Sequence, residues 1–274
     1  MRPRHGVLAV EAPFHGPAGA DPAWRVINRS CVDAGGLVER QPPADFFFTD
    51  PPYNIGVDYH GDGGKSDSMP EFEYLVFLQQ MLKVAACRLR GGGTLAVMLP
   101  DEWADDIGVY LKRDLGMPRR NWIKWHETFG TNQDNKFSRC SRHVLVHVKT
   151  PLATHWFNGD AVRVPSARQT EYADKRANPA GKVPDDVWAF SRVAGTFHER
   201  CGEVPTQVPE AILDRLVRAY TNPGGRVLEF CAGSGSLGRV CVRTGRRYEG
   251  WEVDGPTAAV AARRISEVGI EPVS

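Results

Sequence analysis

The stretch that decides the fold is a run of apolar residues that passes into a glycine-rich turn, Val227-Leu228-Glu229-Phe230-Cys231-Ala232-Gly233-Ser234-Gly235-Ser236-Leu237-Gly238. The run predicts a buried strand, and the glycines allow the backbone to approach a ligand closely where that strand ends. The next predicted strand ends at Glu252, about twenty residues further on, where a carboxylate can accept both hydroxyl hydrogens of a ribose. Strand, turn and acid together predict a site for an adenosine-bearing cofactor.

Short apolar runs alternate with amphipathic segments along the rest of the chain, which indicates an α/β fold with a mostly parallel sheet. Strands are predicted at 25–28, 45–50, 94–99, 226–230 and 248–253. Helices are predicted at 70–90, 103–115, 209–221 and 256–268, with another directly after the glycine turn. Residues 121–128 and 143–149 alternate more strictly, which favours an antiparallel pair at the edge of the sheet.

A second motif, Asp50-Pro51-Pro52-Tyr53, directly follows a continuous apolar run that predicts a strand covered on both faces. Two consecutive prolines fix two φ angles and remove two N–H donors, so the turn is rigid. On its own the tetrapeptide would be a plain type I or type II turn. At the carboxyl end of a buried strand it presents a carboxylate, carbonyls and an aromatic face to a ligand.

This combination of groups suits an exocyclic amine on a flat base. Asp50 and the carbonyl of Pro51 can accept the two hydrogens of the amine, while Tyr53 can stack on the ring. Held in this way, the nitrogen lone pair leaves conjugation with the ring and points at an electrophile. No strong base is needed first, because the proton can leave after the attack.

The two motifs resemble those of the S-adenosylmethionine-dependent DNA amino-methyltransferases, which methylate adenine N6 or cytosine N4. Phe230 with Gly233-Ser234-Gly235 is similar to the F-x-G-x-G cofactor motif of that family, and the proline turn is similar to its D-P-P-Y motif. D-P-P-Y comes first along the chain, as in the circularly permuted beta class. The resemblance covers 24–149 and 184–268. It implies a Rossmann-like fold with a mostly parallel seven-stranded sheet and an antiparallel edge hairpin.

The resemblance also implies roles for single residues. The catalytic residues would be Asp50, Pro51, Pro52 and Tyr53. The cofactor S-adenosylmethionine would be held by Phe230, Gly233, Gly235, Glu252, Thr206 and Asp50. D-P-P-Y favours a flipped-out adenine as the substrate, since the cytosine enzymes of the family more often carry Ser in place of the Asp; cytosine N4 remains the alternative.

Three departures from the family pattern bear on the cofactor. In Val204-Pro205-Thr206-Gln207-Val208-Pro209, which is similar to the family's H-P-T-Q-K-P segment, valines replace the usual His and Lys. Arg29-Ser30 replaces the Gly-Asp that precedes Cys31 in the family, so the acid that contacts adenine is missing. Cofactor affinity is therefore expected to be lower or differently supported, whereas the catalytic motif is intact.

Charge is concentrated on one part of the chain. The net charge is +1, but residues 112–182 hold 14 Lys/Arg against 6 Asp/Glu, so this segment carries +8 and the remainder −7. A basic segment of this kind indicates contact with phosphate, although a solvated basic face would show the same composition. The resemblance implies that the partner is double-stranded DNA. The candidate DNA-binding residues are Lys136, Arg139, Arg142, Arg163, Arg168, Lys175 and Arg176.

The predicted organisation has four parts. They are an N-terminal extension (1–23), a catalytic half (24–150), a small target-recognition insertion (151–184) and a cofactor-binding half (185–274). No apolar run reaches the ~18–20 residues of a membrane span, and no signal-peptide pattern opens the chain. The six cysteines form no C-x-x-C pair, so neither a metal nor a disulfide framework is expected. A cytoplasmic protein is expected, and the resemblance adds a homodimer.

Two other classes of function compete. Gly233, Gly235 and Gly238 match G-x-G-x-x-G, the fingerprint of dinucleotide-dependent oxidoreductases. That interpretation leaves the D-P-P-Y turn without a role, and only 36 residues follow Gly238. The altered Arg29-Ser30 segment would also fit a DNA-binding module without catalytic activity.

Overall fold

The computed structural model describes residues 14–16, 23–32, 42–59, 67–131, 134–150 and 152–269. Most of the predicted extension 1–23 and the first residue of the predicted insertion, Pro151, lie outside the described residues. A single nine-stranded sheet has the order β1-β2-β9-β8-β3-β4-β6-β5-β7. Its strands are β1 (Phe14–His15), β2 (Trp24–Asn28), β3 (Ala44–Thr49), β4 (Leu89–Leu99), β5 (Arg119–Thr131), β6 (Arg139–Val148), β7 (Val187–Ala189), β8 (Arg226–Phe230) and β9 (Arg247–Glu252).

The sheet confirms the mostly parallel α/β prediction, but it has nine strands where seven were expected. Strands β2, β9, β8, β3 and β4 are parallel, and β4, β6 and β5 pair antiparallel. The two additional strands lie at the two edges: β1 pairs with β2, and β7 pairs with β5. They are two and three residues long, too short to show a hydrophobic period. The predicted hairpin is therefore one strand away from the edge.

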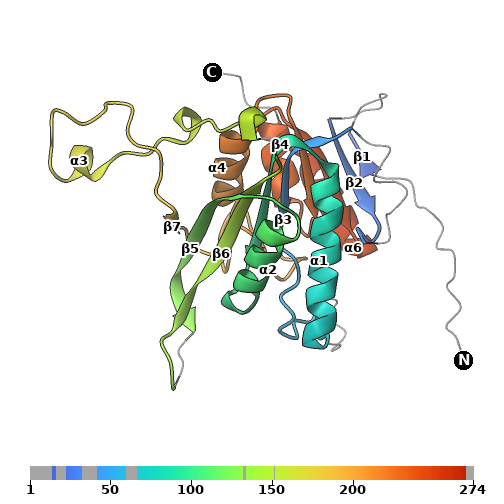
Figure 1. The fold of residues 1–274 in the computed structure, drawn as a ribbon. Helices are drawn as coiled ribbons and strands as arrows, with labels where there is room; N and C mark the ends of the chain where they lie inside the picture. The colour runs from blue at the N-terminus through green and yellow to red at the C-terminus, as the bar shows by residue number, and fades with distance from the viewer. Residues whose placement is uncertain are drawn as a thin grey trace, which may run out of the picture.

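Helices cover both faces of the sheet (Figure 1). Packed on one face are α1 (Glu71–Arg88) and α2 (Asp101–Arg113). Packed on the other face are α4 (Glu210–Tyr220), α5 (Ser236–Arg243) and α6 (Gly255–Ser266). Between β6 and β7 the chain forms two 3₁₀ turns (Leu152–Thr154 and Asp160–Val162) and the short α3 (Ala167–Thr170).

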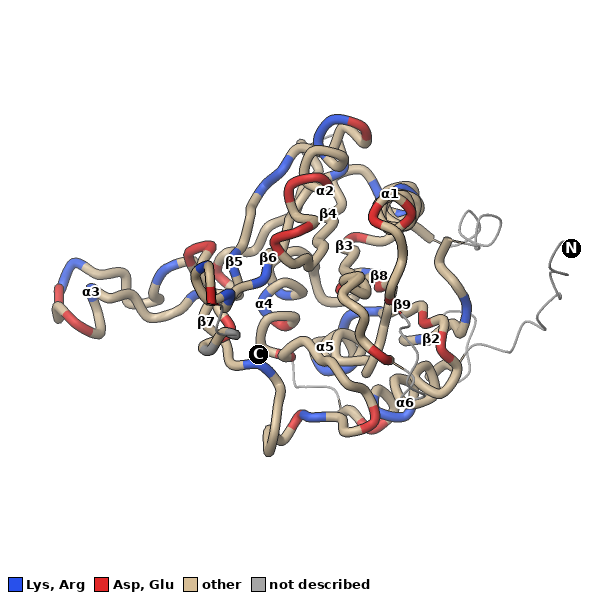
Figure 2. The backbone as a smooth tube through the Cα atoms, turned by 90° about the horizontal axis from the view of Figure 1, so that it is seen from below, with Lys and Arg blue, Asp and Glu red and all other residues tan. Residues whose placement is uncertain are grey.

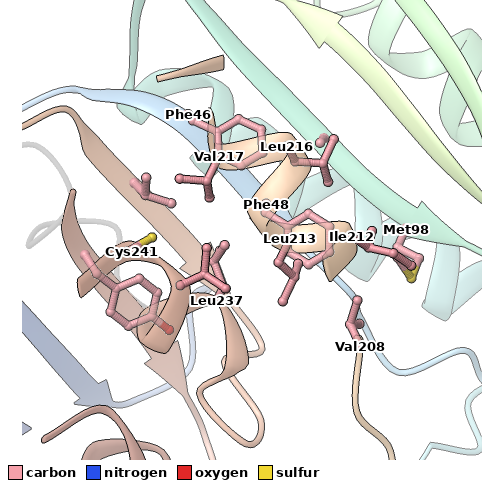
Figure 3. Packing of buried hydrophobic residues seen from close by; sticks show 14 of the residues in the cluster. Phe46, Phe48, Met98, Val208, Ile212, Leu213, Leu216, Val217, Leu237 and Cys241 are labelled. Atoms are coloured by element: carbon pink, nitrogen blue, oxygen red, sulfur yellow. The ribbon is translucent and has the colours of Figure 1, made fainter. Parts of the chain in front are cut away.

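Strand β3 lies in the middle of the sheet, and this position accounts for its three consecutive phenylalanines. Phe46 and Phe48 pack toward α4, whose Leu213, Leu216 and Val217 fill the same cluster (Figure 3). Phe47 points to the opposite face and belongs to the cluster under α1 and α2. All three rings are buried, because each face of β3 has a helical layer over it.

One boundary was predicted incorrectly. The glycines at 91–93 were expected to end the first helix and leave a strand at 94–99. Instead α1 ends at Arg88, and β4 begins at Leu89 and runs through the glycines. A Cβ on Gly92 would meet the backbone of Thr154, so these glycines permit the close approach of the segment that leaves β6. Within the described ranges, no helix is both long and apolar enough to cross a membrane.

An ionic cluster fastens β9 to two other elements. Glu249 of β9 accepts hydrogen bonds from Arg25 of β2 and, at 3.0 Å, from Arg88 at the end of α1. The indole N–H of Trp251 also donates to Glu249, at 2.8 Å. Burial alone would raise the pKa of Glu249, but the two arginines and Trp251 outweigh it and lower the pKa. The side chain of Arg88 is only 4% exposed, and the carboxylate of Glu249 compensates its buried positive charge.

We therefore expect Glu249→Gln to lower the free energy of unfolding by about 3–5 kcal/mol at pH 7, since it leaves a buried cation unpaired. A carboxyl with a lowered native pKa stabilises the fold above its unfolded pKa of about 4.3 and loses this effect as pH falls. Denaturant unfolding of both proteins from pH 7 to pH 3 should show the difference shrinking below about pH 4. An equal difference at all pH values would contradict the ionic explanation.

Candidate active site

The predicted motifs meet around one cavity at the carboxyl ends of β3, β8 and β9. The cavity measures about 170 Å³. It is bounded by the turn after β3, the glycine turn after β8 and the segment that precedes α4. Seven of the predicted catalytic and cofactor-binding residues line it: Asp50, Pro51, Pro52, Tyr53, Thr206, Gly233 and Glu252. Segments that are up to about 200 residues apart in sequence thus share one cleft, as the ligand rule for open α/β sheets requires.

The proline turn is held from behind by two aromatic side chains. Trp103 of α2 donates its indole N–H to the carbonyl of Tyr53 at 2.9 Å. The hydroxyl of Tyr74, on α1, donates to the carbonyl of Pro52. Both donors are buried. The two prolines restrict the turn from within, and these bonds restrict it from outside, so its carboxylate and its aromatic ring have a fixed place in the cavity wall.

Within the turn, Asp50 and Tyr53 contact each other. The Tyr53 hydroxyl donates to Oδ1 of Asp50 at 2.5 Å. It also accepts a hydrogen bond from Nη1 of Arg142 at 2.9 Å. Burial raises the pKa of the Asp50 carboxyl, while the charge of Arg142 and the bond from Tyr53 act in the opposite direction.

The glycine turn and Glu252 are joined directly. Oε2 of Glu252 accepts the N–H of Gly233 at 2.8 Å, and Oε1 accepts the N–H of Asp254 at 3.2 Å. The carboxylate is thereby oriented at the end of β9, and burial raises its pKa. The arrangement fits the ribose-binding role predicted for Glu252. No group of metal-ligating side chains occurs within the described part of the chain.

Two predicted cofactor residues do not line the cavity. Phe230 is fully buried in the core, where it packs edge-on against Phe47 and Trp251. The cavity is lined instead by the two neighbours of Phe230, Glu229 of β8 and Cys231, which follows the end of that strand. Gly235 does not line the cavity and instead packs against Ala261 of α6.

Glu229 is a cavity residue that the sequence motifs did not indicate. Burial raises the pKa of its carboxyl well above the usual value, and the hydroxyl of Tyr248 donates to it at 2.5 Å. An acid within an otherwise apolar predicted strand was the sequence signal that could have identified it.

Two of the three departures from the family pattern lie at the cavity. Val204 and Val208 both line it beside Thr206. Gln207 holds the segment in place, since its amide accepts the N–H of Cys201 at 3.0 Å and donates to the carbonyl of Glu199 at 2.9 Å. The wall here is therefore more apolar than the family motif would make it.

The candidate DNA-binding residues separate into three groups. Lys136 and Arg139 lie at the exposed end of the β5–β6 hairpin, next to Phe137, a 98% exposed ring that the sequence patterns did not single out. Residues 163–186 form a projection, called the arm, whose neck is closed by a bridge between Val164 and Lys182 (Figure 1). The arm carries the remaining four surface candidates, Arg163, Arg168, Lys175 and Arg176.

Both projections mix charges of either sign along the backbone (Figure 2). On the arm, Arg163 pairs with Asp160 and Arg176 with Asp174, while Arg168 and Lys175 are exposed. The third group is Arg142 alone. It lines the cavity rather than the outer surface, and it lies close to the catalytic turn.

The glycine turn yields a test of how tightly α6 closes on it. Gly235 has φ +73°, and a Cβ there would lie 2.9 Å from the Cα of Ala261. Gly245 has a similar φ of +71° with nothing within 4 Å of the added atom. We expect Gly245→Ala to cost about 1–2 kcal/mol for the left-handed backbone alone. Gly235→Ala should cost about 1–3 kcal/mol more from overpacking, measured by denaturant unfolding. Equal losses of unfolding free energy in the two variants would show that α6 moves away from the added methyl group at no cost.

Comparison with known proteins agrees with this geometry. Residues 44–262 match the N6_N4_Mtase family, described as DNA methylase. The type II methyltransferase M.HpaI of Haemophilus parainfluenzae is 33% identical over 221 residues, 81% of this chain and 68% of that one. DNA adenine methyltransferase YhdJ of Escherichia coli K12 is 31% identical over 233 residues, 81% of this chain and 76% of that one.

Solved structures share the fold at low sequence identity. The PvuII cytosine-N4-specific DNA methyltransferase superposes with a TM-score of 0.66 at 13% identity, covering 93% of this chain and 92% of that one. The M1.HpyAVI–SAM complex gives a TM-score of 0.61 at 17% identity, with 88% and 98% covered. With the family match over residues 44–262 and relatives above 30% identity, this chain belongs to the N6/N4 family of DNA methylases.

Proposed function

We propose that the protein transfers a methyl group from S-adenosylmethionine to the exocyclic amine of an adenine flipped out of duplex DNA. The observation that carries this proposal is that Asp50 and Tyr53 line the same cavity as Gly233 and Glu252. The groups suited to an amine and those suited to an adenosine thus lie within reach of one another. Neither an oxidoreductase nor a DNA-binding module without catalytic activity accounts for both.

The choice of adenine rests on two supports. Asp50 begins a D-P-P-Y turn, which in the family favours adenine. A relative 31% identical to the chain is named a DNA adenine methyltransferase. The cytosine-N4-specific neighbour shares the fold at 13% identity, which supports no choice of base.

The residues at the glycine turn fit the adenosine part of the cofactor. Glu252 is fixed by two backbone N–H groups, so its carboxylate is oriented before a ribose arrives. Thr206 and the valines beside it would form the opposite wall. When bound, S-adenosylmethionine would supply a methyl group on a sulfonium to an amine held at the proline turn.

At the turn, Asp50 and the Pro51 carbonyl would accept the two amine hydrogens and direct the lone pair of the nitrogen. In the transfer, the C–N bond would form as the C–S bond breaks, and the sulfur would keep the electron pair. The nitrogen then carries a positive charge and releases one hydrogen as a proton. The turn requires the Asp50 carboxyl in its ionised form, because a protonated carboxyl would offer a donor where an acceptor is needed.

The DNA would lie across the hairpin and the arm. Flipping a base out of the duplex costs a few kcal/mol, and stacking on the Tyr53 ring could recover about 1–3 kcal/mol.

Three statements stay predictions. They are the role of the arm in target recognition, the division of the chain at 24–150, 151–184 and 185–274, and the homodimer. Sedimentation with and without DNA measures the last of these.

The central test is methyl transfer by the protein and by Asp50→Asn. We expect labelled methyl groups on adenine N6 of duplex DNA and a rate about 10²–10³-fold lower for the variant, by analogy with the loss of one transition-state hydrogen bond. Asp105→Asn, on the exposed side of α2, is the matched control and should keep full activity. Modification-aware sequencing identifies the base. Methylation of cytosine N4 alone would contradict the choice of adenine, and no transfer to any DNA would contradict the enzyme.

The arm can be tested by salt dependence. We expect the double variant Arg168→Gln/Lys175→Gln to weaken DNA binding and to reduce the slope of log K against log salt by up to about 0.9 for each phosphate that it no longer neutralises. Fluorescence anisotropy with a labelled duplex at several salt concentrations measures this slope. Lys83→Gln, an exposed residue of α1, should leave it unchanged. The same slope in all three proteins would place the DNA elsewhere.

A further inference from the structure

Four side chains connect the β5–β6 hairpin to the catalytic turn. The carboxylate of Glu127 on β5 forms an ion pair with Nε of Arg142 on β6, at 2.9 Å. Nη1 of Arg142 donates to the Tyr53 hydroxyl at 2.9 Å, and that hydroxyl donates to Oδ1 of Asp50 at 2.5 Å. The last two links are directed hydrogen bonds: the guanidinium donates to the phenol, and the phenol donates to the carboxylate.

The side chain of Arg142 is mostly buried and does not extend over the protein surface. Its side chain is 22% exposed, and that of Glu127 is 10% exposed. The guanidinium carbon lies 5.0 Å from the centre of the Tyr53 ring and 5.5 Å from that of Trp125, the residue opposite it on β5. Three residues thus surround it: the phenol of Tyr53, the indole ring of Trp125 and the carboxylate of Glu127. An arginine engaged on all these sides is poorly placed to bind the DNA backbone.

We propose that Arg142, anchored by Glu127, is a positioning residue that fixes the Tyr53 hydroxyl and the Asp50 carboxylate in the arrangement that receives the target amine. This inference rests on the proposed function. It replaces the phosphate contact that the sequence predicted for Arg142 with a role inside the active site.

The first part of this role is orientation. With Oδ1 of Asp50 held by the Tyr53 hydroxyl, the plane of the carboxylate is set. Among the residues that the structure describes, no hydrogen bond reaches the second oxygen, Oδ2. Oδ2 is therefore the acceptor left for the amine of an incoming base. The same bond fixes the Tyr53 ring, on which that base would stack.

The second part is charge. The cation of Arg142 favours the ionised form of Asp50, and Glu127 opposes it. The other titratable groups near Asp50 are the phenol of Tyr53 in the same turn, Glu229 and Cys231 at the end of β8, Tyr59 beyond the turn and Tyr74 on α1. Arg142 is the only cation in this set of described residues, and with the hydrogen bond from Tyr53 it opposes the effect of burial on the pKa of Asp50.

The test compares the pH dependence of kcat at saturating DNA and cofactor. Opposite charges at this range shift a carboxyl pKa by about 1–3 units. We expect Arg142→Met to move the acid limb of the profile up by about 1–3 pH units, with the rate falling about tenfold per unit below it. Arg142→Lys keeps the cation and should restore most of the wild-type position of the limb. A purely structural loss would lower kcat at all pH values without moving the limb.

Arg139→Met on the same strand is the matched control for phosphate binding. We expect it to raise KM for DNA in a salt-dependent way while leaving the acid limb in place. An Arg142→Met profile of this second kind would overturn the inference. Should Arg142→Met fail to fold, as thermal unfolding would reveal, Arg142→Gln takes its place, and an unmoved limb in that variant would overturn the inference equally.

A double-mutant cycle with Tyr53→Phe checks the direction of the connection. Since Arg142 acts on Asp50 partly through the Tyr53 hydroxyl, the two reductions in kcat should be less than multiplicative. Fully multiplicative reductions would contradict a connection through Tyr53. An inactive wild-type protein would instead overturn the proposed function, whereas an active one with an unmoved limb overturns only this inference.

Discussion

The parallel pairing of β3 with β8 is the constraint on which the rest of the site depends. Thr49 lies opposite Phe230 in this register, and the hydroxyl of Thr49 donates to the carbonyl of Phe230 at 2.9 Å. The strands therefore end at the same level, and the residues that follow them, Asp50 and Cys231, enter one cleft although they lie far apart in the sequence. A slip of one residue would exchange the two faces of the sheet to which the side chains of the slipped strand point. The aromatic packing around β3 resists such a slip.

Sequence reasoning found the parts of the molecule whose signals are local. The triple phenylalanine, the glycine turn and the acid at 252 each follow from the immediate neighbourhood, and the sheet confirms the strands that they predicted. What it missed depends on tertiary partners. Strand β7 is defined by pairing with β5, and β4 extends through its glycines because Asp45 and Thr154 lie against them. Glu229 was hidden because the motif directed attention to Phe230, one residue away on the opposite side of the strand.

The basic segment shows why composition alone assigns roles poorly. Its surplus of +8 is real, yet the positive charges have different surroundings. Arg139, Arg163 and Arg176 are balanced by neighbouring acids, Arg168 and Lys175 face solvent, and Arg142 belongs to the catalytic cavity. The net charge thus includes side chains that can reach a phosphate and also Arg142, whose charge acts on the carboxylate of Asp50. Only the three-dimensional arrangement separates them.

The arm leaves and rejoins the sheet at fixed points. Before it, the segment at Thr154 lies against Gly92 of β4; after it, β7 pairs in parallel with β5. Its neck is closed by the bridge between Val164 and Lys182. Because the entropy of closing a loop grows slowly, by about 0.6 kcal/mol for each doubling of length, such a segment can lengthen or shorten at little cost to stability. The fold therefore separates the part of the chain free to change during evolution from the part that must stay constant.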